Sequence, residues 1–170
     1  MVFEWVEAIL PAIIVVVLLC SFGFRIVTVH QHSMQDTLQE EDRIIITNFG
    51  YHPQNGDVVV ISRSQSQESN LVKRVIATEG QSLRINYNTG EVYVDGVLLD
   101  ESSYIKTPTT RPGDWEIPSV IPEGYVFVMG DNRQVSIDSR NQEVGLIDVR
   151  NIMGKAQFIL FPFNHMGEIK

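Results

Sequence analysis

The sequence has few basic residues, one cysteine and no cluster of histidines. These absences argue against a nucleic-acid-binding surface, a disulfide and a metal site. It carries 13 lysine and arginine residues against 21 aspartate and glutamate residues, a formal net charge of −8. Nucleic-acid phosphates attract clustered basic side chains, and no basic run is present, so we expect no nucleic-acid partner. The single cysteine, Cys20, excludes an intramolecular disulfide. The histidines lack the spacing of metal ligands, so we expect no metal and no other cofactor.

One long stretch contains no charge at all. Residues 8–24, AILPAIIVVVLLCSFGF, approach in length the roughly 20 residues that a helix needs to cross a bilayer. We interpret this stretch as one retained N-terminal transmembrane helix. The alternative is a cleaved secretory signal, but such signals begin with basic residues and end at a small-residue cleavage site, and neither is present. The sequence therefore predicts a membrane anchor with a short connector over residues 1–29 and a second domain over residues 30–170.

The second domain consists of short β-like runs between turn residues. Asn88-Thr89-Gly90 separates two alternating runs and predicts a hairpin turn. Residues 106–124, with four prolines and no periodicity, predict a surface loop, and residues 62–70 predict a second one. Without a sustained helical period, the pattern indicates a mostly β domain. The runs that we expect to be strands are residues 25–29, 42–47, 56–62, 71–78, 82–87, 91–96, 125–130 and 155–161.

A candidate nucleophile, Ser33, lies just after the anchor in the segment HQHSMQDTL. A serine hydroxyl is a weak nucleophile until a neighbouring base removes its proton. His30 and His32 flank Ser33, but neighbours in an extended segment point to opposite faces, so neither reaches the hydroxyl easily. We expect these two, like His52 and His165, to be ordinary surface histidines.

The candidate base is Lys73, inside the apolar run NLVKRVIAT. Its neighbours would exclude water, and because desolvation disfavours the ammonium form, burial lowers the pKa of a lysine. Arg74 alternates to the other face of the expected strand, and we expect it to stay in solvent. Taken alone, a lysine in such a run is more often a solvated side chain on an exposed face.

A third segment, YVFVMGDNRQVSIDSR, ends an apolar strand with a dense run of polar residues. Loops at the ends of strands commonly carry functional sites. The Ser136 hydroxyl is suited to aim a lysine amine at Ser33, and Asp138 with Arg140 is suited to brace the loop. Taken alone, the segment is more typical of a solvated polar loop held by its own turns.

Together the three segments resemble the type I signal peptidases, the membrane-anchored Ser/Lys endopeptidases of bacteria. The likeness rests on HSMQDTL, GDVVVIS, VKRVIATEG, GDNRQVSIDSR and NIMGKAQFIL, which occur in the family's order behind an N-terminal anchor. The resemblance implies a mostly β catalytic domain of antiparallel sheets. It also implies a serine endopeptidase that removes signal peptides from exported preproteins, cutting after small residues in an A-x-A-like pattern.

The resemblance implies roles for single residues as well. Ser33 would be the nucleophile, and Lys73, which follows it by 40 residues, would be the general base. Ser136 matches the serine that orients the lysine, and Gln31 stands where the family completes its oxyanion hole beside the Ser33 amide. Met34 matches a residue that lines the pocket before the scissile bond. The positions that match the support of the site are Gly130, Asp131, Asn132, Asp138 and Arg140.

Three positions depart from the family pattern, which usually reads Ser-Met-x-Pro-Thr-Leu. Asp36 replaces the proline, so we expect the turn after Ser33 to be less constrained. Gln31 replaces a small residue, so its side-chain amide would supply the oxyanion donor in a different geometry. Glu41 stands where a glycine is usual. These departures leave one alternative open: a catalytically impaired, membrane-tethered relative that binds rather than cuts. A self-cleaving Ser/Lys protease of the repressor type is a further reading, which the anchor and the acidic charge oppose.

The location of the second domain depends on which argument is followed. Glu4 and Glu7 precede the apolar stretch and Arg25 follows it, which by the positive-inside rule favours a cytoplasmic C-terminal domain. The resemblance implies the opposite, because signal peptides are released outside. One arginine is a small bias, so we expect a single-pass protein of the cell membrane with its catalytic domain on the extracytoplasmic side. The expected partners are signal peptides of exported preproteins and the lipid bilayer.

Overall fold

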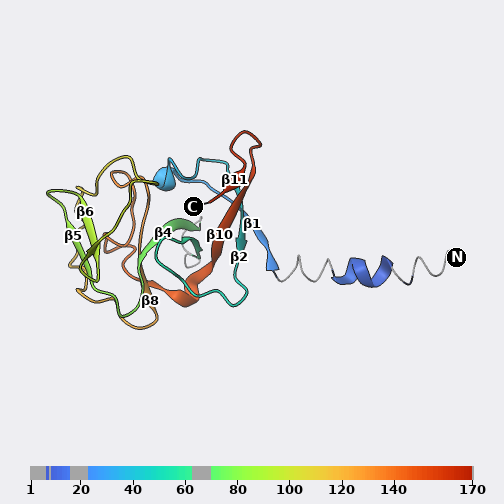
Figure 1. The fold of residues 1–170 in the computed structure, drawn as a ribbon, viewed down its shortest axis with the longest axis horizontal. Helices are drawn as coiled ribbons and strands as arrows, with labels where there is room; N and C mark the ends of the chain where they lie inside the picture. The colour runs from blue at the N-terminus through green and yellow to red at the C-terminus, as the bar shows by residue number, and fades with distance from the viewer. Residues whose placement is uncertain (1–6, 8, 16–22, 63–69, 170) are drawn as a thin grey trace.

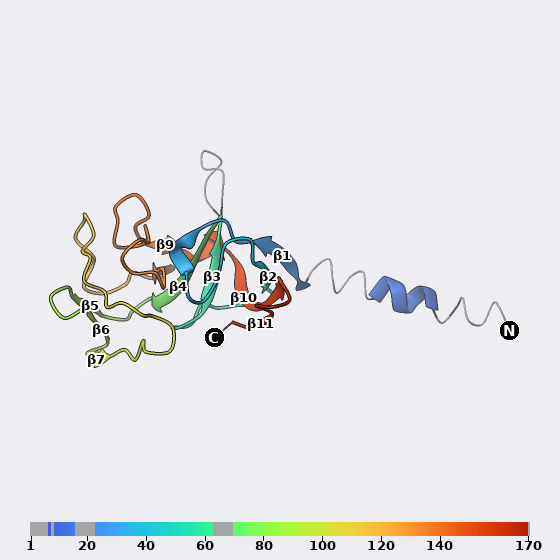
Figure 2. The ribbon, with the colours of Figure 1, turned by 90° about the horizontal axis from the view of Figure 1, so that it is seen from above.

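The computed structural model describes residues 7, 9–15, 23–62 and 70–169. Residues 9–15 are helical with exposed apolar side chains, and Figures 1 and 2 show this helix apart from the β domain. In these described ranges, no helix is long and apolar enough to cross a membrane. The other residues of the expected span, 8 and 16–22, lie outside the described residues, as do Glu4, Cys20 and most of the expected loop at 62–70.

The β domain contains a large and a small antiparallel sheet (Figure 1). The small sheet has the order β5 (Leu83–Asn86), β6 (Glu91–Val94) and β7 (Val97–Leu98). The large sheet has the order β1-β2-β10-β3-β4-β8-β9, and β11 pairs with β10. Its strands are β1 (Arg25–Thr28), β2 (Arg43–Thr47), β3 (Val58–Ile61), β4 (Leu71–Ala77), β8 (Tyr125–Met129), β9 (Ile147–Asp148), β10 (Ile152–Phe161) and β11 (Gly167–Glu168). Two short 3-10 helices are present, η1 (His32–Met34) and η2 (Val149–Asn151).

The structure confirms the mostly β, antiparallel fold class and all eight strands expected from the sequence. The hairpin turn is also confirmed, since β5 and β6 pair antiparallel around Gly90, whose φ is +79°. Only β7, β9 and β11 were missed. Each has two residues, which is too short for an alternating pattern to be recognised.

Strand β4 lies inside the large sheet, between β3 and β8. All seven of its residues are buried. Val72 packs in one apolar cluster with Val58, and Val75 packs in another with Val128, so both faces of the strand are covered. A strand covered on both faces reads as a continuous apolar run, which explains the run around Lys73.

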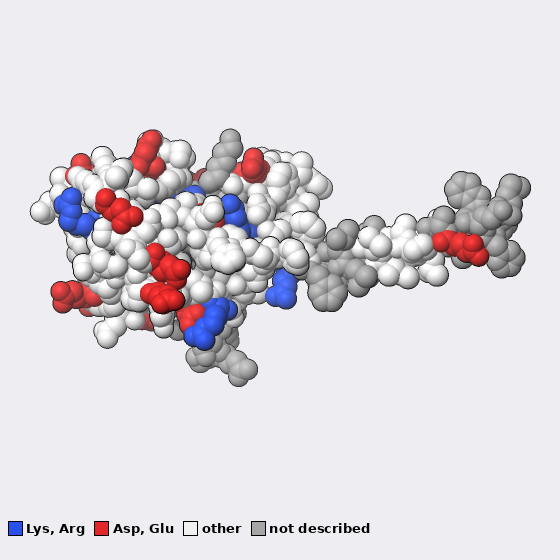
Figure 3. Space-filling view, turned by 60° about the horizontal axis from the view of Figure 1, so that its bottom comes forward, with Lys and Arg blue, Asp and Glu red and all other residues white. Residues whose placement is uncertain are grey.

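One face of the β domain shows how the net negative charge is distributed. In Figure 3 acidic side chains are scattered over this face, and the described lysine and arginine side chains do not gather into a patch. Much of the arginine charge is instead inside the domain, because Arg74, Arg133 and Arg140 are all buried. These three side chains belong to the candidate site.

The bulge in β10 gives a first test of the fold. Gly154 has a φ of +156°, and a Cβ atom there would lie 2.6 Å from the backbone oxygen of Thr47. We expect Gly154→Ala to lower the free energy of unfolding by about 1–3 kcal/mol, because β2 must move to make room. Urea unfolding measures the change. The control is Gly167→Ala, where a Cβ would meet nothing within 4 Å; equal stability of the two variants would contradict the prediction.

Candidate functional site

Ser33 and Lys73 meet where the turn that carries Ser33 packs on β4 of the large sheet. Ser33 is the second residue of η1, which begins directly after Gln31, whose backbone is extended. Lys73 Nζ is 2.6 Å from Ser33 Oγ and donates a second hydrogen bond to the Val72 carbonyl at 3.1 Å. The serine is 8% exposed and the lysine 0%. The two residues that the sequence singled out as nucleophile and base are therefore in direct contact.

The histidines near Ser33 do not contact its hydroxyl. His30 and His32 are exposed, and each stands beside a surface glutamate, at 3.6 and 3.4 Å. The geometric reason differs from the expected alternation, since Ser33 lies in a 3-10 turn rather than an extended segment. His165 is not an ordinary surface histidine: it is half-buried, with Nδ1 2.9 Å from the buried carboxylate of Asp42.

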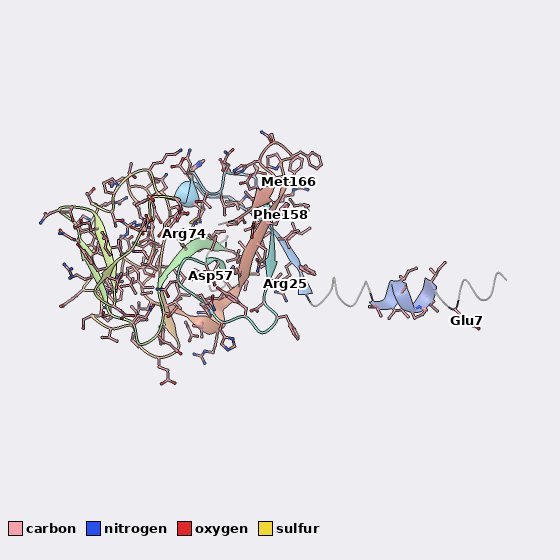
Figure 4. The ribbon with its side chains drawn as sticks, viewed as in Figure 1. Glu7, Arg25, Asp57, Arg74, Phe158 and Met166 are labelled. Atoms are coloured by element: carbon pink, nitrogen blue, oxygen red, sulfur yellow. The ribbon has the colours of Figure 1, made fainter. Side chains whose placement is uncertain are left out.

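Arg74 is buried, which corrects the expectation that it stays in solvent. It is 1% exposed, and Figure 4 places it in the interior of the β domain. Its Nε and Nη2 donate to Asp131 at 2.9 and 2.7 Å, and Nη1 donates to the Gly56 carbonyl at 2.7 Å. The ring of Tyr104 lies 4.0 Å from its Cζ. The expectation failed because β4 has no solvent face, and because Arg74 pairs with Met129, two residues before Asp131.

The loop after β8, residues 130–140, docks on the turn that carries Ser33. The Asn132 amide donates to the Ser33 carbonyl at 3.0 Å, and its side chain donates to the His32 carbonyl at 3.2 Å. Thr37 Oγ1 donates to Asp131 at 2.5 Å. The carboxylate that binds Arg74 therefore also binds the turn of residues 33–38, which we call the nucleophile turn after the expected role of Ser33. Asp131 and Asn132 are thus brought to the site, as expected.

Gly130, Asp138 and Arg140 support the loop from within. Arg140 donates to both carboxylate oxygens of Asp138, at 2.8 and 2.9 Å, and the Gly130 amide donates to the same carboxylate at 3.0 Å. Burial alone would raise the pKa of Asp138, but the hydrogen bonds and charge of Arg140 outweigh it and lower that pKa. A Cβ at Gly130 would lie 2.4 Å from the Ser33 carbonyl oxygen, so only glycine permits this close approach.

Ser136 is near the dyad but does not make the expected contact. It is 2% exposed, and its Oγ has no hydrogen-bond partner among the residues that the structure describes. A Cβ at Gly130 would lie 2.3 Å from this oxygen, so the hydroxyl faces the same glycine that packs on Ser33. The hydroxyl also lies close enough to the Asp138 carboxylate to contribute to the lowering of the Asp138 pKa.

A groove of about 330 Å³ opens above Ser33. Gln31, which is half-buried, belongs to its wall. Met34 does not line this groove; it is 0% exposed and packs in the apolar cluster with Val29 and Leu38, so it supports the turn from beneath. The other residues that line the groove are His30, His32, Leu71, Val135, Ile137 and Glu143.

Hydrogen bonds hold the turn after Ser33, where aspartate replaces the family's usual proline. The amides of Thr37 and Leu38 both donate to the Met34 carbonyl, at 3.0 and 2.8 Å. Asp36 has a φ of +89°, which a proline ring cannot adopt. Glu41 has a φ of +69°, a left-handed conformation that favours glycine, which explains why glycine suits this position.

The segment of residues 101–111 contacts the site, although no site role was predicted for it. Glu101 forms a bidentate pair with the buried Arg133, and Thr109, inside the expected surface loop, is 0% exposed. The partners are 24–32 residues apart in the chain, and no local pattern indicates which carboxylate an arginine will meet. Within the described ranges, no group of three or more histidine, cysteine or acidic side chains is arranged to hold a metal ion.

The chain is similar to known peptidases over nearly its whole length. Residues 2–161 match the family described as signal peptidase, peptidase S26. Signal peptidase I of Bacillus licheniformis is 34% identical over 174 residues, covering 96% of this chain and 91% of that protein. Signal peptidase I T of Bacillus subtilis (strain 168) is 33% identical, covering 98% and 89%. A crystal structure of a signal peptidase I from Enterococcus faecalis V583 aligns with 62% of this chain and 97% of its own, at 25% identity and a TM-score of 0.48.

The buried Asp138–Arg140 pair predicts a dependence of stability on pH. We expect Asp138→Asn to lower the free energy of unfolding at pH 7 by about 3–5 kcal/mol, because it leaves a buried guanidinium without its carboxylate. The pKa of Asp138 is lowered in the folded state, so its stabilising effect is complete above the ordinary aspartate pKa and is lost as pH falls through the lowered value. The difference between wild type and variant should therefore shrink in acid.

Urea unfolding at several pH values measures this difference. Asp148→Asn is a matched control, because Asp148 also pairs with an arginine two residues later, Arg150, whose side chain is 85% exposed. We expect a smaller loss of stability in the control. A constant difference between wild type and Asp138→Asn from pH 7 to about pH 2 would contradict the linkage.

Asp36 and Glu41 both have a positive φ. We expect opposite effects on stability when each is replaced by the residue that is usual in the family. Asp36→Pro should destabilise the protein by more than about 1 kcal/mol, because the ring is incompatible with a φ of +89°. Glu41→Gly should leave stability unchanged or raise it by up to about 1 kcal/mol, since glycine removes the strain of a φ of +69°. Thermal unfolding of both variants checks the signs, and a stabilising Asp36→Pro would show that the turn adopts another conformation.

Proposed function

The chain belongs to the signal peptidase family, peptidase S26, and on this premise we propose that it cuts signal peptides with a Ser33–Lys73 dyad. The observation that carries the proposal is the 2.6 Å contact between Lys73 Nζ and Ser33 Oγ at a buried site. Removing a charged amine from water costs free energy, so a fully buried position favours the neutral form that can accept a proton.

The proposed reaction begins with transfer of the Ser33 hydroxyl proton to Lys73 Nζ. Ser33 Oγ then bonds to the carbonyl carbon before the scissile bond, and the carbonyl oxygen takes up the negative charge. When the peptide bond breaks, the leaving amine takes the proton from Lys73 and an acyl-enzyme remains. Lys73 next removes a proton from water, the resulting hydroxide bonds to the ester carbonyl carbon, and Ser33 Oγ takes the proton back from Lys73 as the ester bond breaks. The short Nζ–Oγ distance supports the two transfers between these atoms.

The groups around the dyad are suited to stabilise this charge. Ser33 lies in the first turn of η1, where backbone N–H groups have no partner within the helix. We assign the oxyanion to this N–H and to the Gln31 side chain, which lines the groove; losing one such donor typically costs about 10²- to 10³-fold in rate. We assign the buried Ser136 hydroxyl to accept a hydrogen bond from Lys73 once the amine is protonated, and its position beside Gly130, which packs on Ser33, supports this role.

We assign the substrate residues before the scissile bond to this groove. Leu71, Val135 and Ile137 line it together with Ser33 and make its walls partly apolar. Apolar walls accept apolar side chains such as alanine, which accords with an A-x-A-like cleavage pattern in exported preproteins.

Members of this family are membrane-associated, and we assign the membrane contact of this chain to its N-terminal segment. The uncharged stretch at residues 8–24 supports a single anchor, with the catalytic domain on the extracytoplasmic side. Protease accessibility of the C-terminal domain in intact cells tests this topology, and protection of the domain from external protease would contradict it.

Cleavage of a preprotein with an A-x-A site tests the dyad. We expect Ser33→Ala and Lys73→Met each to lower kcat by at least about 10²-fold in detergent-solubilised protein, because one removes the nucleophile and the other the base. Methionine keeps most of the lysine volume, so the loss would not arise from a cavity.

The control is Ser119→Ala, at an exposed serine outside the site, which should cut at the wild-type rate. Unchanged cleavage in Lys73→Met would refute the Ser/Lys assignment. No cleavage by folded wild-type protein would favour the alternative of a membrane-tethered relative that binds signal peptides without cutting them.

A further inference from the structure

Residues 101–111 form a strap across the outside of the loop 130–140. Glu101 accepts hydrogen bonds from Arg133 Nη1 and Nη2 at 2.9 and 2.5 Å, and Thr109 Oγ1 accepts another from Nη1 at 2.5 Å. Arg133, which is 0% exposed, donates in turn to the Gly130 carbonyl at 3.1 Å. The strap therefore fixes the guanidinium that supports the glycine packed on Ser33.

The strap also contacts the strand that carries the base. The Tyr104 ring lies 4.0 Å from Arg74 Cζ and closes the site that holds this guanidinium. The Tyr104 hydroxyl donates to Glu101 at 3.1 Å, which fixes the ring. Burial and the adjacent Glu101 raise the pKa of Tyr104, so the hydroxyl remains a donor at neutral pH. The Tyr104 side chain thus links Glu101 to Arg74, the residue next to Lys73.

A third contact reaches the nucleophile turn but is weaker. Lys106 Nζ lies 2.5 Å from Asp36 Oδ1, and the lysine side chain is 75% exposed. Exposed ion pairs contribute about 0–1 kcal/mol, so this bridge adds little by itself. The buried contacts at Tyr104 and Arg133 are the ones on which the geometry depends.

We infer that Tyr104 is a positioning residue for the Ser33–Lys73 dyad, an inference that rests on the proposed function. Ser33 and Lys73 lie on separate elements, and Asp131 joins them by binding Arg74 of β4 and Thr37 of the nucleophile turn. The Tyr104 ring keeps Arg74 in place for this bridge. Without the ring, water reaches the guanidinium, the bridge loosens, and the Oγ–Nζ distance is no longer held.

The test replaces the ring and compares the result with a matched pair far from the site. Tyr93 lies 4.1 Å from Arg84 in the small sheet, the same kind of arginine–aromatic contact. We expect Tyr104→Leu to lower kcat about 10-fold with KM within about twofold, since small misplacements of reacting groups slow the chemical step. Tyr104→Phe keeps the ring and should restore kcat to within about threefold, and Tyr93→Leu should cut at the wild-type rate.

A second readout does not depend on cleavage. The Asn132 amide donates to the Ser33 carbonyl, so its hydrogen exchange reports how firmly the loop is docked on the nucleophile turn. We expect faster exchange at Asn132 in Tyr104→Leu than in Tyr104→Phe or Tyr93→Leu. If Tyr104→Leu does not fold, Thr109→Val, which removes one acceptor of Arg133, should show the same two changes at smaller size.

The outcomes separate the inference from the proposed function. Wild-type kcat or unchanged Asn132 exchange in Tyr104→Leu overturns the positioning role, as does an equal effect of Tyr93→Leu. Faster exchange in Tyr104→Leu, in a protein whose wild type does not cut, supports the positioning role and refutes the peptidase assignment.

Discussion

The architecture of the site depends on the ion pair between Arg74 and Asp131. It joins three segments, because Arg74 follows Lys73 on β4, Asp131 lies in the loop after β8, and Thr37 of the turn after Ser33 donates to the same carboxylate. Buried ion pairs often add little net stability, because desolvation offsets their attraction. The value of this pair lies in specifying one arrangement: each partner would be a costly unpaired charge anywhere else in the core.

The same principle recurs around the loop 130–140. Arg133 pairs with Glu101 and Arg140 with Asp138, both in buried positions. A loop held in this way is more rigid than its polar sequence suggests, which suits a site where a serine and a lysine are in hydrogen-bond contact. The acidic surface of the protein follows in part from this arrangement, since three of its arginines are inside.

The sequence was sufficient for the strands and for Ser33 and Lys73, because β-strand patterns are local and the motifs carried the resemblance. It was insufficient for Arg74, where alternation predicted a solvent-facing side chain. That prediction holds only for a strand with one solvent-exposed face, and both faces of β4 are buried. Tyr104 and Glu101 were missed because their role comes from contacts with residues about 30 positions away, which depend on the tertiary fold. The left-handed φ of Asp36 was not predicted, because it is a property of the folded turn.

The adjacent basic residues of β4 have a consequence for folding. Lys73 faces Ser33 and Arg74 faces Asp131, so the two basic side chains occupy opposite faces of one buried strand. A shift of β4 by one residue against β3 and β8 would exchange those faces. The Arg74 guanidinium would then face Ser33, and the Lys73 amine would face Asp131. Val72 and Val75 would also leave the apolar clusters in which they pack. Lys73 and Arg74 together therefore favour the observed register of β4 over a register shifted by one residue.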